Sequence, residues 1–189
     1  MAFRPPQQAR SRATWDRVLD AGVEILEREG HEALTIAALC ERAGVTPPTV
    51  YARAPDKQTL LVAIHRRAVD RLDADSQLTG PLAPADATRE LARTFFAHAP
   101  LLRAIFQLAA ADEAVFEQGS RATAAVSRRF REAVGGDAQR ADALVRVLIG
   151  ALAHRVVYGQ TFDSDLAQPD ADFIHALEEL AELYLGAEV

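Results

Sequence analysis

Apolar residues recur at helical spacing from near the start of the chain to near its end. Between positions 13 and 29 they fall three and four residues apart, and Gly30 follows the last of them. This pattern predicts an amphipathic helix that ends at the glycine. A shorter run over 36–43 has the same spacing and is followed by Gly44, so it predicts a second helix.

Two prolines mark the start of a third, short helix. Thr46 is a good N-cap residue, and Pro47 and Pro48 follow at the first two helical positions. Amide hydrogens at those positions have no intrahelical acceptor, so prolines start this helix and do not break it. Pro55 restricts the residue before it to extended conformations, which keeps the helix short. Helix, glycine turn and short helix form the arrangement of a DNA-reading helix-turn-helix.

Longer helices follow the helix-turn-helix. Asp56 is placed to cap a helix over about 57–72, and the stretch 76–84, rich in glycine and proline, is the clearest boundary in the chain. We expect an all-α protein with a helix-turn-helix domain, N-terminal arm and connecting helix over 1–75, and a helical bundle over 76–189. With five more helices beyond the boundary the chain has about nine, the last five at about 85–98, 100–110, 113–134, 137–160 and 170–185.

The last two predicted helices carry more apolar surface than one core can bury. Over 137–160 almost no polar side chain lies between Ala143 and Ala153, and the helix over 170–185 has two neighbouring apolar stripes. A helix that is apolar nearly all round is buried on both sides. We infer a homodimer in which these two helices form a four-helix interface with their copies, where Gly150 would allow a close approach.

The helix-turn-helix residues also resemble those of a known family. Five short segments carry the resemblance: Thr35-Ile36-Ala37, Ala43-Gly44-Val45-Thr46, Thr49-Val50-Tyr51, Asp56-Lys57 and Leu60-Leu61. Together they are similar to the N-terminal domain of TetR-type (TetR/AcrR) bacterial transcriptional regulators over roughly Arg12–Ala68. One position departs from the family pattern, because Ala54 stands where a large aromatic side chain normally packs under the recognition helix. A missing buried phenylalanine costs about 3 to 5 kcal/mol unless neighbours fill the gap.

The resemblance implies a repressor that binds a palindromic operator in double-stranded DNA as a homodimer. Two recognition helices about 34–36 Å apart would read the two halves of the palindrome. Base edges in the major groove are expected to face Pro47, Pro48, Thr49 and Arg53. Phosphates are expected to be held by Thr35, Thr46, Tyr51 and Lys57. Arg12, at the end of a flexible arm over 1–11, is a further candidate DNA contact, although the arm with Arg4 and Arg10 is equally compatible with a frayed tail.

The resemblance further implies that a small molecule binds within 76–189 and releases the DNA, which makes this the ligand-binding and dimerisation domain. Pockets for such effectors have an apolar lining with few polar groups. An apolar or amphipathic effector is expected to contact Phe96, Arg103, Phe106, Gln107, Phe116, His154 and Tyr158. Aromatic stripes are also typical of a plain hydrophobic core, so that interpretation of the same residues stays open.

The net charge of -6 is distributed unevenly along the chain. Residues 1–67 hold ten basic and eight acidic side chains, whereas the rest of the chain holds eleven basic and nineteen acidic ones. Phosphate binding needs a local basic face and not a basic protein, so the acidic total does not exclude DNA. The uneven distribution is also compatible with ordinary scatter.

Other kinds of chemistry are not indicated. The five histidines share no metal-ligand spacing, and the chain has neither a glycine-rich phosphate loop nor a nucleophile elbow, so no metal, cofactor or catalytic residue is predicted. No uncharged stretch approaches the ~20 residues of a membrane span, and the single Cys40 fits a reduced cytoplasmic setting. Two alternatives stay open: an all-helical interaction protein that has lost specific DNA binding, and a small helical enzyme.

Overall fold

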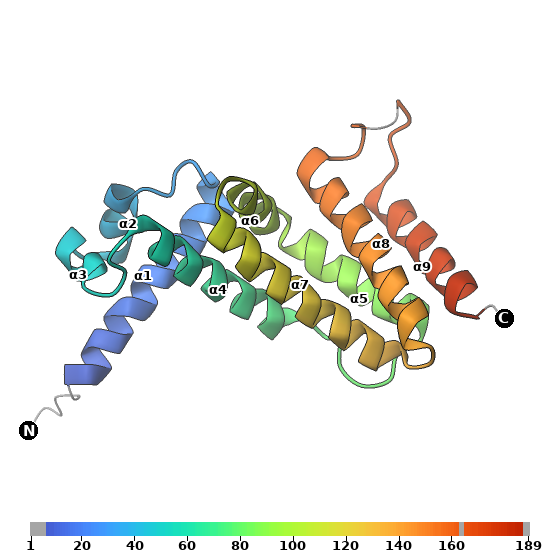
Figure 1. The fold of residues 1–189 in the computed structure, drawn as a ribbon. Helices are drawn as coiled ribbons and strands as arrows, with labels where there is room; N and C mark the ends of the chain where they lie inside the picture. The colour runs from blue at the N-terminus through green and yellow to red at the C-terminus, as the bar shows by residue number, and fades with distance from the viewer. Residues whose placement is uncertain (1–6, 163–164, 187–189) are drawn as a thin grey trace, which may run out of the picture.

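The computed structural model describes residues 7–162 and 165–186, and of residues 7–9 only the backbone. Within these ranges the chain forms nine α-helices and no strand, which confirms the all-α fold (Figure 1). The helices are α1 (Gln7–Glu29), α2 (Ile36–Ala43), α3 (Pro47–Tyr51), α4 (Lys57–Asp75), α5 (Pro84–Ala97), α6 (Ala99–Ala111), α7 (Glu113–Val134), α8 (Ala138–Tyr158) and α9 (Asp170–Gly186). We call α1–α4 the reader and α5–α9 the body.

Helix α1 begins earlier than the sequence pattern predicted. It starts at Gln7 and not near Ala13, because the residues between them are good helix formers that follow a pair of prolines. The prediction of a flexible arm is therefore wrong for residues 7–11, and Arg10 lies within the helix. Residues 1–6, including Arg4, lie outside the described residues.

The reader is built around a core that continues into the body. Buried side chains of α1, α2, α3 and α4 pack together, and Leu101, Ile105 and Leu108 of α6 join the same cluster. Gly22 of α1 lies directly against Ile64 of α4, since a Cβ built on the glycine would be only 2.6 Å from the isoleucine Cδ1. The predicted division after residue 75 coincides with the end of α4, but apolar packing crosses it.

A second core holds the body together. Helices α5, α8 and α9 contribute most of its buried residues, and Phe130 of α7 lies at 0% exposure within it. Helices α5 and α6 meet at His98 with an angle of 81° between them. Among the described residues no single helix is long and apolar enough to cross a membrane, and α5 and α6 together reach that length and hydropathy only as this bent pair.

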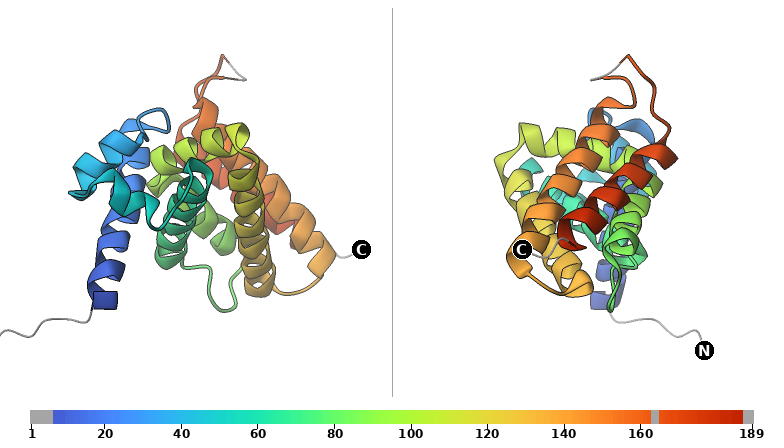
Figure 2. Two further views of the ribbon diagram at one scale, coloured as in Figure 1. Left: turned by 60° about the vertical axis from the view of Figure 1, so that its left-hand side comes forward. Right: turned by 90° about the vertical axis from the view of Figure 1, so that its right-hand side faces the viewer.

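The two ends of the molecule carry different elements. Helices α2 and α3 lie at one end, and α8 and α9 lie at the other (Figure 1). Figure 2 shows α8 and α9 side by side on the outer face of the body. The short helix that would read DNA is therefore far from the two helices expected to form the dimer.

Candidate nucleic-acid interface and ligand pocket

A left-handed glycine sets the turn between α2 and α3. Gly44 has φ 64° and ψ 43°, a conformation that glycine adopts without the steric cost of a Cβ. The amide of Val45 donates to the carbonyl of Cys40 at 3.0 Å, which satisfies one of the last carbonyls of α2. This turn confirms the predicted end of α2 and fixes the direction in which α3 leaves it.

Helix α3 starts at the two prolines, as predicted. Thr46 occupies the N-cap position, but its hydroxyl lies 3.1 Å from the hydroxyl of Thr49 and caps no amide. The reason is that Pro48 has no N–H, while the amide of Thr49 donates to the carbonyl of Thr46 at 2.9 Å. The helix is started by proline geometry and a backbone hydrogen bond, and the two hydroxyls remain on the surface.

One face of α3 is open to solvent. Pro47, Pro48 and Thr49 are exposed and Tyr51 is 46% exposed, whereas Val50 is completely buried in the reader core. Every residue of this short helix that the sequence assigned to DNA therefore lies on its outer side. A recognition helix presents an exposed face of this kind to the major groove.

The chain leaves α3 through a buried alanine. Ala54 is 1% exposed and belongs to the reader core, so this is a core position, as the family pattern suggested. Asp56 then caps α4 by accepting a hydrogen bond from the Thr59 amide at 2.7 Å, and this hydrogen bond is the main cause that lowers the pKa of Asp56. The cost predicted for the missing aromatic side chain at position 54 stays a prediction.

Further polar groups surround the exposed face of α3. The hydroxyl of Thr35 accepts from the Ala38 amide at 3.1 Å and so caps the exposed N-terminus of α2. Arg53 donates to the Ser11 hydroxyl at 2.8 Å, which places its guanidinium next to the first turns of α1. The side chains of Arg12 and Lys57 are exposed and make no hydrogen bond or ion pair with any other residue that the structure describes.

Two acidic side chains of α1 are paired with arginines of α4. Asp20 accepts two hydrogen bonds from Arg67 of α4, at 2.8 and 3.1 Å. Glu27 pairs with Arg71 one turn further along α4, at 2.9 Å. These pairs tie α1 to α4 and neutralise two carboxylates that would otherwise repel phosphates.

The residues predicted to bind an effector do not all come together. Arg103 donates to the carbonyl of Val156 at 2.9 Å, and Phe106 packs in the body core beside Phe95. Gln107 is exposed, and Phe116 is 61% exposed on α7. An effector role for these four stays a prediction, and none of them lines the pocket between α8 and α9.

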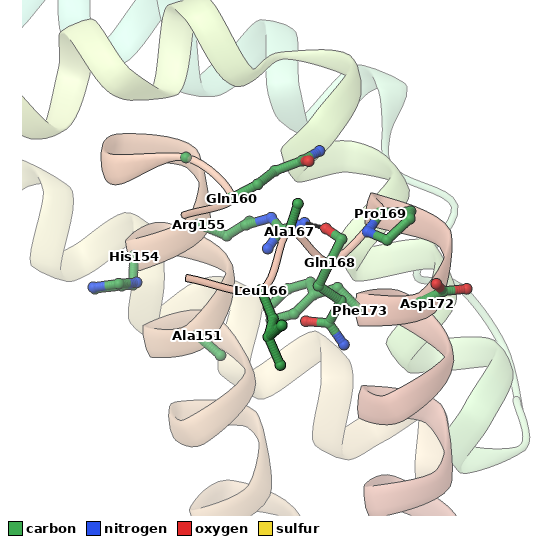
Figure 3. Close-up of a pocket in the computed structure, with 11 residues that line it drawn as sticks. Ala151, His154, Arg155, Gln160, Leu166, Ala167, Gln168, Pro169, Asp172 and Phe173 are labelled. Carbon is green, nitrogen blue, oxygen red and sulfur yellow. Dashed lines mark hydrogen bonds between the residues drawn. The ribbon is translucent and has the colours of Figure 1, made fainter. Parts of the chain in front are cut away.

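A pocket of about 630 Å³ lies between the ends of α8 and α9 (Figure 3). It is lined by three residues of α8, by residues 159–160 and 166–169, and by two residues of α9. Of the predicted effector residues only His154 lines it, while Tyr158 lies against His154 with ring centroids 4.9 Å apart. Phe96 does not line the pocket, but its ring makes an edge contact with the ring of Phe173, which does; the two ring centroids are 6.4 Å apart.

Arg155 is the pocket residue that the sequence reasoning missed. It is 8% exposed, donates to the Asp170 carboxylate at 2.9 and 3.1 Å and to the carbonyl of Gln168, and lies 4.9 Å over the Phe173 ring. Arg155 lies just beyond the apolar stretch between Ala143 and Ala153 and is followed by two valines, and this apolar setting was the available signal. This side chain clasps the start of α9 to α8 and forms one wall of the pocket. No cluster of potential metal ligands occurs among the residues that the structure describes.

Comparison with known proteins agrees with this geometry. Residues 18–64 match the sequence model of "Bacterial regulatory proteins, tetR family". The HTH-type transcriptional repressor KstR of Mycolicibacterium smegmatis is 41% identical over 58 residues, which are 31% of this chain and 28% of that repressor. The KstR repressor of Mycobacterium tuberculosis is 25% identical over 170 residues, 90% of this chain and 67% of the relative.

Solved structures show the same fold along nearly the whole chain. One neighbour, a transcriptional regulator of Rhodococcus sp. Rha1, has a TM-score of 0.70 and 21% identity over 92% of this chain and 97% of its own. The multidrug binding protein EbrR, complexed with imidazole, has a TM-score of 0.68 and 19% identity over 98% of both chains. Residues 18–64 therefore carry a domain that matches the tetR family of bacterial regulatory proteins, and the chain as a whole has the fold of these structural neighbours.

Proposed function

We propose that this protein is a ligand-responsive transcriptional repressor that binds a palindromic operator as a homodimer. The exposed face of α3, held by the left-handed turn at Gly44 and the prolines at its start, is the observation that carries the proposal. The KstR relatives are named transcriptional repressors, which supports the same function. It would act by binding, in the cytoplasm, and without catalysis.

Each DNA-facing group has a separate role in this proposal. Thr49 and Arg53, with the two prolines, meet base edges, while Thr35, Thr46, Tyr51 and Lys57 hold phosphates through hydroxyls, charge and helix N-termini. Arg12 adds a phosphate contact from α1. Arg53 would exchange its hydrogen bond with Ser11 for one with DNA, because both partners are exposed and the exchange costs little.

The homodimer is supported by where the exposed apolar side chains lie. Of the large hydrophobic side chains that are more than a third exposed, most belong to α8, α9 or the segment between them. On the two helices they are Val147, Tyr158, Leu180, Leu183 and Tyr184. Patches of this kind mark protein interfaces, and a copy of the same two helices would cover them in a four-helix arrangement.

An effector would act through the body. The pocket between α8 and α9 has the size of a small-molecule site and combines apolar walls with Arg155 and His154. EbrR, a structural neighbour, is named a multidrug binding protein, which supports ligand binding by the fold. Release of DNA requires that the ligand bind the free dimer more tightly than the DNA-bound one, by about 1 to 3 kcal/mol.

The proposal is tested by DNA binding to the region upstream of the protein's own gene. Fluorescence anisotropy is measured with purified protein at about 50 and about 200 mM salt, with unlabelled nonspecific duplex as competitor. We expect specific binding that weakens steeply at the higher salt. Binding no tighter than to the competitor, across tiled genomic fragments as well, would contradict the proposed function.

A further inference from the structure

A buried histidine on α4 takes no part in the interface or the pocket. His65 is 1% exposed, and within the described residues neither its Nδ1 nor its Nε2 has a hydrogen-bond partner. A neutral imidazole can be buried in this way at some cost, because it loses its hydrogen bonds to water. A charged imidazolium would lose far more solvation free energy in the same place. The closed structure therefore accommodates His65 only in its neutral form.

His65 lies where the body holds the helix that leads to the reader. A Cβ built on Gly119 of α7 would be 3.6 Å from Nε2 of His65, so the ring faces the glycine across the contact between α4 and α7. The glycine leaves room for the ring beside the α7 backbone. Helices α4 and α7 lie side by side (Figure 1), so any change that expels the ring would act directly on their contact.

On its other side α4 is firmly attached to α1. Ile64, the neighbour of His65, packs against Gly22, and Arg67 binds Asp20 with two hydrogen bonds. These contacts make α4 move with α1 and the rest of the reader. The contact of α4 with α7 is thus one of two places where the reader meets the body, the other being the packing of α1 against α6.

No charged group compensates for the burial of His65. On α7, Glu117 and Arg121 lie on either side of Gly119, are 62% and 72% exposed and pair with each other. Further along α7, Arg129 is bound to Asp73 of α4. On α1, the Asp20 and Glu27 carboxylates facing α4 are taken by Arg67 and Arg71. Burial is the only cause that lowers the pKa of His65.

We propose that His65 and Gly119 form an acid-sensitive latch between α4 and α7. While the ring is neutral the latch is closed and α7 fixes the position of α4. Protonation expels the ring and opens the contact, which frees the reader to move relative to the body. The effect on DNA rests on the proposed function, since two readers that have lost their fixed spacing no longer match adjacent major grooves. The opening itself does not rest on it.

The sign of the pH dependence follows from burial. In the closed state the pKa of His65 is lowered, whereas in the open state the ring takes the ordinary histidine pKa of about 6.5. The open state therefore binds the proton more readily. Above about pH 6.5 the equilibrium constant that favours the closed over the open state keeps its full value. Below that pH it falls by up to about tenfold per pH unit.

The experiment measures hydrogen exchange of α4 and α7 amides at pH 7.5 and 5.5 by mass spectrometry, corrected for the intrinsic pH dependence of exchange. Wild type is compared with His65→Leu and His65→Gln, and with His175→Gln, which removes a histidine that is 70% exposed on α9. We expect up to about tenfold faster exchange at pH 5.5 in wild type and His175→Gln, and less than twofold in both His65 variants. Equal acceleration in wild type and both His65 variants, or none in wild type, would overturn the latch.

The same proteins are then tested for DNA binding at both pH values. Wild type should lose up to about tenfold more affinity on acidification than His65→Leu. Acid-dependent exchange without DNA binding at either pH would support the latch and contradict the proposed function. Normal DNA binding without acid-dependent exchange would overturn the latch and leave the proposed function intact.

Discussion

In the reader, α1 and α4 approach so closely that Gly22 leaves no space for a Cβ beside Ile64. In the body, α8 and α9 leave apolar side chains such as Val147 and Leu183 more than half exposed. The reader is thus held together by contacts within one chain, whereas the outer face of the body leaves apolar side chains exposed to solvent. On the proposed function, the difference teaches that DNA recognition is prepared within the monomer, while its spacing and control would depend on a second copy and an effector.

The largest effect is expected when a charge is introduced on the outer face of the body. Val147→Glu should convert the dimer to a monomer, because a carboxylate would be buried in an apolar interface. Loss of the second reader should weaken operator binding by about 100-fold or more, since linked binding sites gain that much through effective concentration. Sedimentation velocity and DNA anisotropy measure the two effects.

Phe116→Glu is the matched control for this change. Phe116 is 61% exposed, but it lies on α7 and outside the proposed interface. The variant should remain a dimer with unchanged operator affinity. A dimer that survives Val147→Glu, or one that is lost equally in both variants, would show that α8 does not form the interface.

The close approach within the reader is tested by filling it. Gly22→Ala places a methyl group against Ile64 and should lower the free energy of unfolding by about 1 to 3 kcal/mol, the usual cost of overpacking. Gly119→Ala is the control, because its Cβ would meet only ordinary contact distances. It should be neutral or stabilising by up to about 1 kcal/mol. The free energies of unfolding are measured by urea titration at pH 7.5. Equal changes in the two variants would contradict the close packing of Gly22 against Ile64.

At the junction of reader and body, a substitution is expected to raise the free energy of unfolding by a smaller amount than Gly22→Ala lowers it. His65→Leu removes two buried nitrogen atoms that have no hydrogen-bond partner in the described part of the chain, so it should raise the free energy of unfolding at pH 7.5 by about 1 kcal/mol. Urea titration measures the change. A loss of stability would mean that the imidazole makes a favourable interaction, such as a bridging water, that the leucine cannot replace.

The smallest expected effects distinguish the phosphate contact assigned to Lys57 from the base contact assigned to Arg53. Lys57→Ala should weaken binding to all duplexes alike and reduce the slope of log affinity against log salt by about one unit. Arg53→Ala should instead relax sequence preference, because it is assigned to base edges. Anisotropy over a salt series with operator and scrambled duplex separates them. An unchanged salt slope with altered preference in Lys57→Ala would reverse the two assignments.

The reader could be predicted from the sequence because its geometry is set by nearby residues. Gly44, Pro47 and Pro48 each impose a backbone conformation locally, so the turn and the start of α3 lay where expected. The start of α1 was placed six residues too late because the first turn carries only the small Ala9 and no large apolar residue to reveal it. The side chain of Thr46 was also misjudged, since the effect of Pro48 on the capping amide was overlooked.

The candidate ligand pocket could not be predicted in the same way. Arg155 meets Asp170 through a chain reversal between α8 and α9, and neither residue type indicates that contact in one sequence. Arg103 carried the polar character expected of a ligand contact, but it caps the last turn of α8 through the Val156 carbonyl. Contacts between helices distant in sequence decided these roles, so hydrophobic periodicity identified the helices and not the cavity between them.

The most direct test of the central claim is a hydroxyl-radical footprint of the wild-type dimer on its upstream region. Two protected patches, related by two-fold symmetry and about 34–36 Å apart on one face of the duplex, are predicted. The patches should disappear in Val147→Glu at the protein concentration that protects them in wild type. A single patch, or protection without symmetry that persists in Val147→Glu, would contradict the account of a dimeric DNA reader.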